Sequence, residues 1–129
     1  MITLSEEEIL SLHEKLMDRY SGPDGVRGLR DRKALDSALN APFQTINGED
    51  LYPSVIEKAV RLGYGLVVNH PFIDGNKRVG TMAMLMLLRL NNVTLAYDQD
   101  DLLSIMLAVA SGKADVSALL SWVLSHQSQ

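Results

Sequence analysis

Apolar residues recur every three or four positions over the first twenty residues, a spacing that predicts an amphipathic helix. Ser5 followed by three glutamates predicts a capping box at its start, with negative charge in its first turn. The stretch 21–25, which contains Gly and Pro, ends this helix near Tyr20. His13 lies beside polar neighbours, so we expect it at the surface. The apolar positions are Ile9, Leu12, Leu16 and Met17.

A shorter helix is predicted from about Asp31 to Asn40, where apolar residues again share one face and Pro42 stops the helix. The stretch 43–50 then carries an Asn-Gly turn between apolar or β-branched residues, a pattern typical of a hairpin. We expect a flap there, with at most weak strand pairing. Its residues are Phe43, Gln44, Thr45, Ile46, Asn47 and Gly48.

The next helix has a broad apolar face between residues 55 and 67. We expect Asp50 to cap it, with Pro53 in its first turn. It should end near Asn69, because a proline at position 71 disfavours helical geometry at the residue before it.

Residues 79–90 are apolar nearly all the way round, which predicts a helix buried at the centre of a bundle. We assign Met82, Met84 and Met86 to its core packing. A membrane span needs about 20 such residues. This run is shorter and is interrupted by Arg89, so we expect no membrane association.

Aspartates begin two further predicted helices, over about 98–110 and 115–125, and His126 follows in a polar tail that we expect to fray. The elements together predict an all-α fold: a compact bundle of about six helices in a single domain over residues 1–129. A composition of 47% hydrophobic and 22% charged residues is typical of such a globular domain.

The composition also excludes several functions. The chain has no cysteine, which rules out disulfides, thiolate nucleophiles and Cys-ligated zinc. Its net charge of −4 argues against direct nucleic acid binding. The acidic N-terminus lacks the features of a signal peptide, so we expect a cytoplasmic protein.

One local basic cluster stands against the acidic average, formed by Arg27, Arg30, Arg32 and Lys33. The simpler interpretation is a solvated loop and helix start. The alternative is a docking surface for an acidic partner.

Functional groups are concentrated in residues 70–78, between two apolar helices. The free N–H groups and dipole of the following helix, with Gly75 and Asn76 shaping the turn, could form a nest for phosphate oxygens. Arg78 can hold phosphate bidentately, and Lys77 adds a mobile charge. The sequence of this loop is His70-Pro71-Phe72-Ile73-Asp74-Gly75-Asn76-Lys77-Arg78.

The other groups of the loop suit the same chemistry. Asp74 is an oxygen ligand suited to the magnesium that accompanies nucleotide phosphates. His70 is the natural general base for a hydroxyl, because imidazole changes charge near neutral pH. Phe72 should point into the core and anchor the loop.

Each of these residues also has an ordinary structural explanation. His70 could cap the carbonyls of the preceding helix, Asp74 could be a turn residue, and the two cations could form a solvated first turn. Any one of these explanations would be favoured alone. The whole set in this order favours a functional site.

The nine residues resemble the signature of the Fic/Doc superfamily, His-Pro-Phe-x-(Asp/Glu)-Gly-Asn-(Gly/Lys)-Arg. The similarity extends over roughly residues 4–124 and includes Gly28-Leu29-Arg30-Asp31 and Asp50-Leu51-Tyr52-Pro53. Most Fic enzymes have glycine where this chain has Lys77, and they transfer AMP from ATP to a protein hydroxyl. Doc-type toxins have lysine there and act as kinases on a threonine of elongation factor Tu.

The resemblance implies a role for each matching position. His70 would be the general base, Asp74 would hold Mg²⁺, and Gly75 and Asn76 would bind ATP phosphates through their backbone. Lys77 and Arg78 would also bind phosphates and stabilise transition-state charge. The flap would align the target by strand addition. The resemblance thus implies a toxin that phosphorylates a translation elongation factor and inhibits protein synthesis.

The resemblance also implies a protein antitoxin as partner. Many Fic enzymes carry an inhibitory helix, (Ser/Thr)-x-x-x-Glu-(Gly/Asn), and its nearest matches here, residues 3–8 and 45–50, both fail at the last position. Three alternatives stay open. They are an AMP transferase of the Fic kind, a catalytically silent helical binding module, and, more remotely, a DNA-binding protein.

Overall fold

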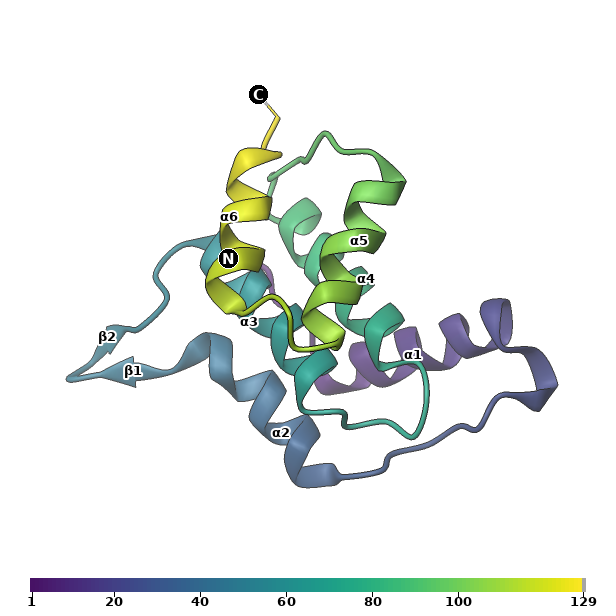
Figure 1. Ribbon diagram of the computed structural model, residues 1–129. Helices are drawn as coiled ribbons and strands as arrows, with labels where there is room; N and C mark the ends of the chain where they lie inside the picture. Colours follow the sequence, from purple (N-terminus) through teal and green to yellow (C-terminus); the bar gives the residue numbers. More distant parts are fainter. Residues whose placement is uncertain (129) are drawn as a thin grey trace.

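The structure is a computed structural model that describes residues 1–128, and over these residues the chain forms six α-helices and one hairpin (Figure 1). The helices are α1 (Glu6–Tyr20), α2 (Arg32–Asn40), α3 (Val55–Val68), α4 (Asn76–Leu90), α5 (Gln99–Ala110) and α6 (Val116–Ser125). Two 3-10 helices, η1 (Gly22–Asp24) and η2 (Ala41–Phe43), follow α1 and α2. The hairpin pairs β1 (Thr45–Ile46) with β2 (Glu49–Asp50) in antiparallel register. The predicted all-α fold with a short flap is therefore confirmed.

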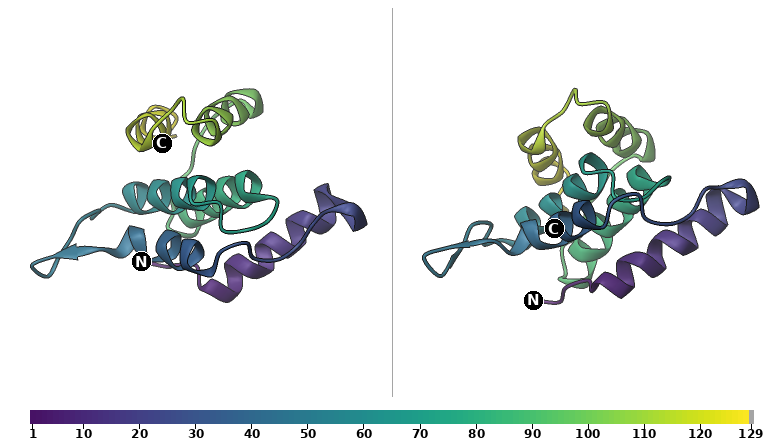
Figure 2. Two further views of the ribbon diagram at one scale, coloured as in Figure 1. Left: turned by 60° about the horizontal axis from the view of Figure 1, so that its bottom comes forward. Right: turned by 90° about the horizontal axis from the view of Figure 1, so that it is seen from below.

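The helices lie in three layers, which the left view of Figure 2 shows edge-on. α3 and α4 form the middle layer, with α1 and α2 on one side and α5 and α6 on the other. α1 packs mainly against α4, and α2 packs against α3. The short connection between α3 and α4 is therefore fixed by elements on both sides of it.

The two middle helices pack with their backbones close together, because glycines face each other. A β-carbon built on Gly63 would lie 3.0 Å from the Gly80 carbonyl oxygen, and one built on Gly80 would lie 2.8 Å from the Gly63 carbonyl oxygen. Separations this short leave no room for a side chain at either position. The distance between α3 and α4 is thus fixed, and so are the two ends of the loop that joins them.

The predicted buried helix is α4, which begins at Asn76. Its core residues are Val79, Ala83, Met84, Leu87 and Leu88. The assignment of all three methionines to the core was wrong, because Met82 and Met86 are 37% and 36% exposed. Alternate residues of a helix point in different directions. No helix within residues 1–128 combines the length and the apolar character that a bilayer span requires.

Side-chain caps set where several helices begin. At α1 the Ser5 hydroxyl accepts the N–H of Glu8, and the Glu8 carboxylate accepts the N–H of Ser5, so the predicted capping box is present. Asp31 and Asp115 accept backbone N–H groups in the same way at α2 and α6. Each cap satisfies an N–H group that has no partner within its own helix.

The start of α3 differs from the prediction. Ser54, rather than Asp50, is the N-cap, and Pro53 precedes the helix instead of lying in its first turn. Asp50 belongs to β2, and its carboxylate lies 3.2 Å from the ammonium of Lys58. A strand and a short connection therefore occupy the residues that the sequence pattern assigned to the helix start.

The C-terminal tail is paired rather than frayed. The N–H of Ala96 donates to the carbonyl of His126 at 2.8 Å, and the N–H of Ser128 donates to the carbonyl of Thr94 at 2.9 Å. The His126 ring also stacks on Trp122 with 4.1 Å between ring centroids. The prediction of fraying was wrong, because the extended segment after α4 offers backbone partners that are distant in sequence.

Candidate active site

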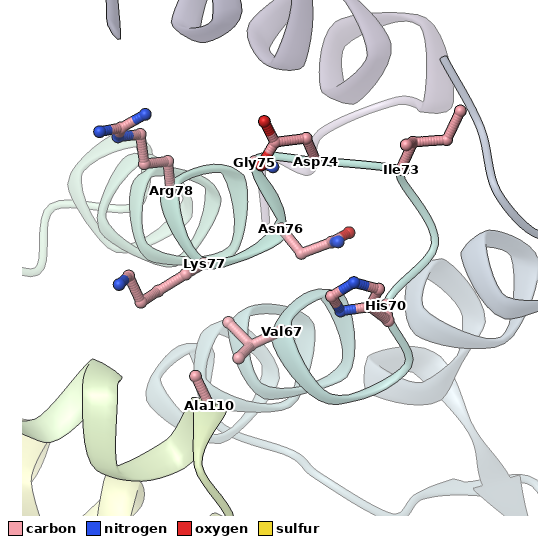
Figure 3. Close-up of a pocket in the computed structure, with 9 residues that line it drawn as sticks. All are labelled: Val67, His70, Ile73, Asp74, Gly75, Asn76, Lys77, Arg78 and Ala110. Carbon is pink, nitrogen blue, oxygen red and sulfur yellow. Dashed lines mark hydrogen bonds between the residues drawn. The ribbon is translucent and has the colours of Figure 1, made fainter. Parts of the chain in front are cut away.

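The connection between α3 and α4, with the first turn of α4, lines an open pocket (Figure 3). Its volume is about 370 Å³, which is within the range of small-ligand sites. The structure thus brings together the polar residues that the sequence predicted for the site. The lining residues are Val67, His70, Ile73, Asp74, Gly75, Asn76, Lys77, Arg78 and Ala110.

The first half of this loop is paired with the segment that leads into α2. The backbone N–H groups of Arg30 and Asp31 both donate to the carbonyl of Pro71, at 2.7 and 3.1 Å. The N–H of Ile73 donates to the carbonyl of Gly28 at 3.1 Å. The loop is therefore one half of a small antiparallel pairing and is held along its length.

His70 has an unusual backbone conformation. Its side chain is exposed, and its φ angle of +55° lies in the left-handed region. It follows Asn69, the C-cap of α3, where a glycine is the usual residue. A side chain in this region costs roughly 1–2 kcal/mol, so neighbouring contacts must hold it there.

The carbonyls on both sides of His70 are occupied by one arginine. Arg30 donates from Nε to the His70 carbonyl at 2.6 Å and from Nη2 to the Asn69 carbonyl at 3.0 Å. The structural explanation that the His70 ring caps the end of α3 is therefore wrong, since Arg30 caps it. The imidazole is left to face the pocket, where Figure 3 shows it near Asn76.

A buried amide closes the second half of the loop. The side-chain oxygen of Asn76 accepts the N–H of Phe72, and its nitrogen donates to the Phe72 carbonyl, both at 2.9 Å. Phe72 is 1% exposed and lies in the core, as its sequence pattern indicates. The Asn76 side chain is occupied by these bonds, so its backbone N–H is the group that it offers to a ligand.

His13 of α1 contacts the loop from the side of the protein core. Its side chain is 2% exposed, its ring stacks on Phe72 with 3.7 Å between centroids, and its Nε2 lies 2.7 Å from the Asp74 carbonyl oxygen. Because a carbonyl only accepts, Nε2 must donate. The prediction of a surface position was wrong: Ile9, His13 and Met17 are spaced by four residues and share the buried face of α1.

The N-terminus of α4 is open towards a ligand. Its N-cap is Gly75, with φ +84°, and no side chain among residues 1–128 caps its first turn. The Asp74 carboxylate accepts the N–H of Gly75 at 2.8 Å. The N–H groups of residues 76–78 then have no partner within the helix. These groups and the helix dipole together form a site for an anion.

The charged side chains at this terminus are not neutralised by opposite charges. No ion pair within residues 1–128 involves Asp74, Lys77 or Arg78. In Figure 3 the side chains of Lys77 and Arg78 leave opposite sides of α4. The Arg78 guanidinium rests over the ring of Tyr20, 4.7 Å from its centroid. Two cations at the positive end of a helix are unfavourable for the helix alone, but they suit a polyanionic ligand.

A second, more apolar groove adjoins the pocket. Lys77 and Arg78 border both, and the groove has a volume of about 290 Å³. Its other lining residues are Leu16, Tyr20, Thr81, Met82, Gln99, Leu103 and Met106. A ligand with anionic and apolar parts could therefore extend from one space into the other.

Asp74 fits magnesium delivered by a nucleotide better than an ion held by the protein alone. Within residues 1–128 no three His, Asp or Glu side chains are grouped closely enough to hold a metal. Magnesium usually keeps several waters and is bound through one or two carboxylates together with substrate phosphates. A single exposed carboxylate beside a phosphate nest is the donor set that this arrangement needs.

The predicted flap is formed, but it lies away from the pocket. Phe43 and Ile46 are 42% and 58% exposed. The hairpin projects beside the N-terminal end of α3, whereas the loop lies at its C-terminal end (Figure 1). The buried ammonium of Lys58 holds the base of the hairpin by donating to Asp50 and to the carbonyl of Tyr52. A target bound by both regions must span roughly the length of α3, about 21 Å.

The basic cluster has separate structural roles. Arg27 pairs with Glu14 and Asp18, both at 2.9 Å, and Arg32 pairs with Glu6. These contacts join the segment before α2, and the first residue of α2, to α1. Arg30, Arg32 and Lys33 are exposed, as expected for a solvated loop and helix start, but Arg30 also binds the loop and Arg27 is half-buried.

Three supporting residues were not identified from the sequence as parts of the site: His13, Arg30 and Tyr20. The spacing of four from Ile9 would have revealed that His13 faces the core. Arg30 lies in a stretch noted for its similarity to Doc-type sequences, but its contact with the loop depends on a separation of about 40 residues. Tyr20 ends its helix and gives no local signal.

Comparisons with known proteins agree with this geometry. Residues 3–88 match the model of the Fic/DOC family. The chain is 37% identical over 97 residues to "Toxin Doc" of Mycolicibacterium smegmatis, covering 74% of this chain and 75% of that protein. It is 28% identical over 116 residues to "Protein kinase doc" of Escherichia phage P1, covering 90% of this chain and 88% of that protein.

Proposed function

Since this chain belongs to the Fic/DOC family, we propose that it transfers the γ-phosphoryl group of ATP to a hydroxyl of a protein. The observation that carries the proposal is the uncapped start of α4, where Lys77 and Arg78 stand beside the exposed imidazole of His70. The lysine separates this loop from the glycine-containing form that transfers AMP. The similarity to a protein named as a kinase supports the same choice.

In the proposed reaction the phosphates of ATP bind to the N–H groups of residues 76–78 and to the two cations. His70 accepts the proton of the target hydroxyl as that oxygen forms its bond to the γ-phosphorus. The bond between the γ-phosphorus and the bridging oxygen breaks, and ADP leaves with the electron pair. Lys77 and Arg78 stabilise the charge that develops on the transferred group.

Asp74 would hold Mg²⁺ in this arrangement. The ion would offset phosphate charge and supply electrostatic stabilisation when bound. The Gly75 N–H donates to one oxygen of the Asp74 carboxylate, which leaves the other oxygen available to coordinate the ion.

ATP labelled separately at the α and γ positions tests the reaction. We expect γ label, and a mass gain of one phosphate, on a target protein in the presence of magnesium. Label from the α position would show AMP transfer and overturn the kinase assignment. His70→Ala should lower the labelling rate at least about a hundredfold and leave a measurable residual rate, while His126→Ala, a change outside the pocket, should leave it unchanged. If His70→Ala had no effect on any activity, the loop would belong to a silent binding module.

We further propose that the target is a translation elongation factor, with elongation factor Tu and one of its threonines as the first candidate. The exposed flap would then contact the target chain by strand addition. A mass-shift assay on purified translation factors, with ATP and magnesium, tests this directly. Modification of an unrelated protein and of no elongation factor would overturn the choice of target.

A protein antitoxin is the expected partner, as the name of the mycobacterial relative suggests. It would act by covering the loop and excluding ATP or the target. We expect the product of a neighbouring gene to relieve the inhibition of translation by the purified chain. Undiminished inhibition in its presence would contradict the assignment of that product as an antitoxin.

A further inference from the structure

Arg30 binds the backbone on both sides of His70 but does not line the pocket. We infer that Arg30 is a positioning residue for His70, and that it acts by fixing the left-handed conformation at this position. The inference deepens the proposed function, and its activity measurements rest on that function. Its structural measurements do not.

The geometry of the contact is the first argument. The φ and ψ angles of a residue describe how its two flanking peptide planes are oriented relative to each other. The Asn69 carbonyl belongs to the plane before the His70 Cα, and the His70 carbonyl belongs to the plane after it. One planar guanidinium binds both carbonyls, at 3.0 and 2.6 Å. It therefore fixes the orientation of the two planes, and with it the direction of the Cα–Cβ bond that carries the imidazole.

The conformation of His70 is the second argument. A φ angle of +55° is disfavoured for a residue with a β-carbon. Such a conformation persists only when its surroundings determine it. The two carbonyls bound by Arg30 lie at the C-terminal end of α3, where a cation is also favoured by the helix dipole.

Arg30 is itself held in place. Its own N–H and that of Asp31 donate to the carbonyl of Pro71, the residue after His70. Asp31 caps α2, and the Asn69 side chain donates to the carbonyl of Ala34 at 3.3 Å. The start of α2 and the end of α3 are thus joined around His70, with the guanidinium at the centre of the junction.

Arg30 is exposed, which makes the inference testable without unfolding the chain. Water can solvate the two carbonyls when the guanidinium is removed, so we expect a small change in melting temperature. Lysine at this position keeps the charge but offers a single ammonium, which lacks the planar fork that binds both carbonyls. Arg30→Lys therefore removes the geometric constraint and little else, and Arg30→Met removes the charge as well.

The experiment compares these variants with Arg32→Lys and Arg32→Met, which make the same changes two residues further along. NMR should show shifted or doubled backbone and ring signals of His70 in both Arg30 variants and in neither control. With ATP and the target, kcat should fall at least about tenfold in the Arg30 variants. The KM for ATP should stay within about twofold, because the nest at residues 76–78 is untouched. In a His70→Ala background, Arg30→Lys should cause no further loss.

Unchanged His70 signals in both Arg30 variants would overturn the inference, even if kcat fell. An equal loss on top of His70→Ala would overturn it too, because Arg30 would then act independently of the imidazole. If the wild-type chain showed no transferase activity, the proposed function would fail. The NMR comparison would still decide whether Arg30 positions His70.

Discussion

The N-termini of α1 and α4 are built in opposite ways. α1 begins with a reciprocal capping box and three glutamates, so two of its terminal N–H groups are hydrogen-bonded and its dipole is offset by negative charge within the chain. α4 begins with a left-handed glycine, and no side chain within residues 1–128 caps its first turn, which carries Lys77 and Arg78. The first terminus is arranged for stability. The second leaves N–H groups and positive charge available to a ligand.

The two termini are nevertheless connected. His13, about two helical turns beyond the start of α1, donates to the Asp74 carbonyl just before α4. The well-capped helix α1 thus stabilises, through His13, the uncapped N-terminus of α4. The comparison teaches that the energetic cost of an uncapped anion site at α4 is offset by contacts with a neighbouring helix, α1, whose own N-terminus is capped.

The largest effect is expected from Gly75→Ala. A β-carbon there would lie 2.9 Å from Met17 Sδ and 3.2 Å from His13 Nε2, in addition to the strain at φ +84°. Gly112→Ala is the matched control, with φ +79° and no atom within 4 Å of the added carbon. The strain alone should cost each variant about 1–2 kcal/mol of unfolding free energy, and Gly75→Ala should lose more because Met17 and His13 must move. Activity and ATP binding should fall at least about a hundredfold in Gly75→Ala alone.

Calorimetric titration with ATP and chemical denaturation measure the two parts of this prediction. Equal loss of ATP binding in both glycine variants would show that the α4 terminus has no special role. Unchanged ATP binding in Gly75→Ala would show that the nest does not bind phosphate.

Lys77→Glu should make the α4 terminus resemble that of α1. A carboxylate at the second helical position interacts favourably with the dipole, so stability should rise by about 0.3–1 kcal/mol. Loss of the cation should weaken ATP binding roughly ten- to a hundredfold. Lys33→Glu occupies the same position of α2 and should gain similar stability without affecting ATP. Melting curves and ATP titration of the two variants test this trade-off.

His13→Leu should remove the contacts by which α1 stabilises the loop. It removes the donor to the Asp74 carbonyl and the ring that stacks on Phe72, so we expect a loss of about 1–3 kcal/mol in unfolding free energy. His13→Gln, which keeps a donor, should retain part of that stability. Urea denaturation of both variants measures the difference. A His13→Leu variant as stable as the wild type would show that α1 does not support the loop.

The smallest effect concerns Glu8 and depends on pH. Hydrogen bonds from the Ser5 backbone and then from its hydroxyl lower the pKa of Glu8 below its ordinary value of 4.5. Because its pKa is depressed in the folded state, its contribution to stability is complete above the ordinary value and is lost as pH falls through the folded pKa. Glu8→Ala should therefore be less stable than wild type at pH 7, with a difference that vanishes below that pKa.

Melting temperatures of the two proteins across this pH range provide the test, and ATP binding at neutral pH should be equal in both. A stability difference that persisted at the acid end would show that Glu8 acts through packing rather than through its charge.

Local sequence patterns were sufficient to predict the secondary-structure elements and to identify the functional loop at residues 70–78. The capping box of α1, the aspartates before α2 and α6, and the apolar run of α4 each lie within a few residues of what they determine. The same holds for the Asn-Gly turn of the flap. The loop was recognised because its functional groups are consecutive in the chain. For these features the physical causes are short-range, so the sequence by itself determined them.

Tertiary structure alone decided how the loop is held. Arg30 reaches carbonyls some 40 residues away, and His13 reaches one 61 residues away. The positive φ of His70 and the separation of the flap from the pocket also follow from how α2, α3 and α4 pack. No local signal in the sequence encodes these contacts. Their partners meet because burying the apolar faces of several helices at once fixes where the polar groups at the helix ends must lie.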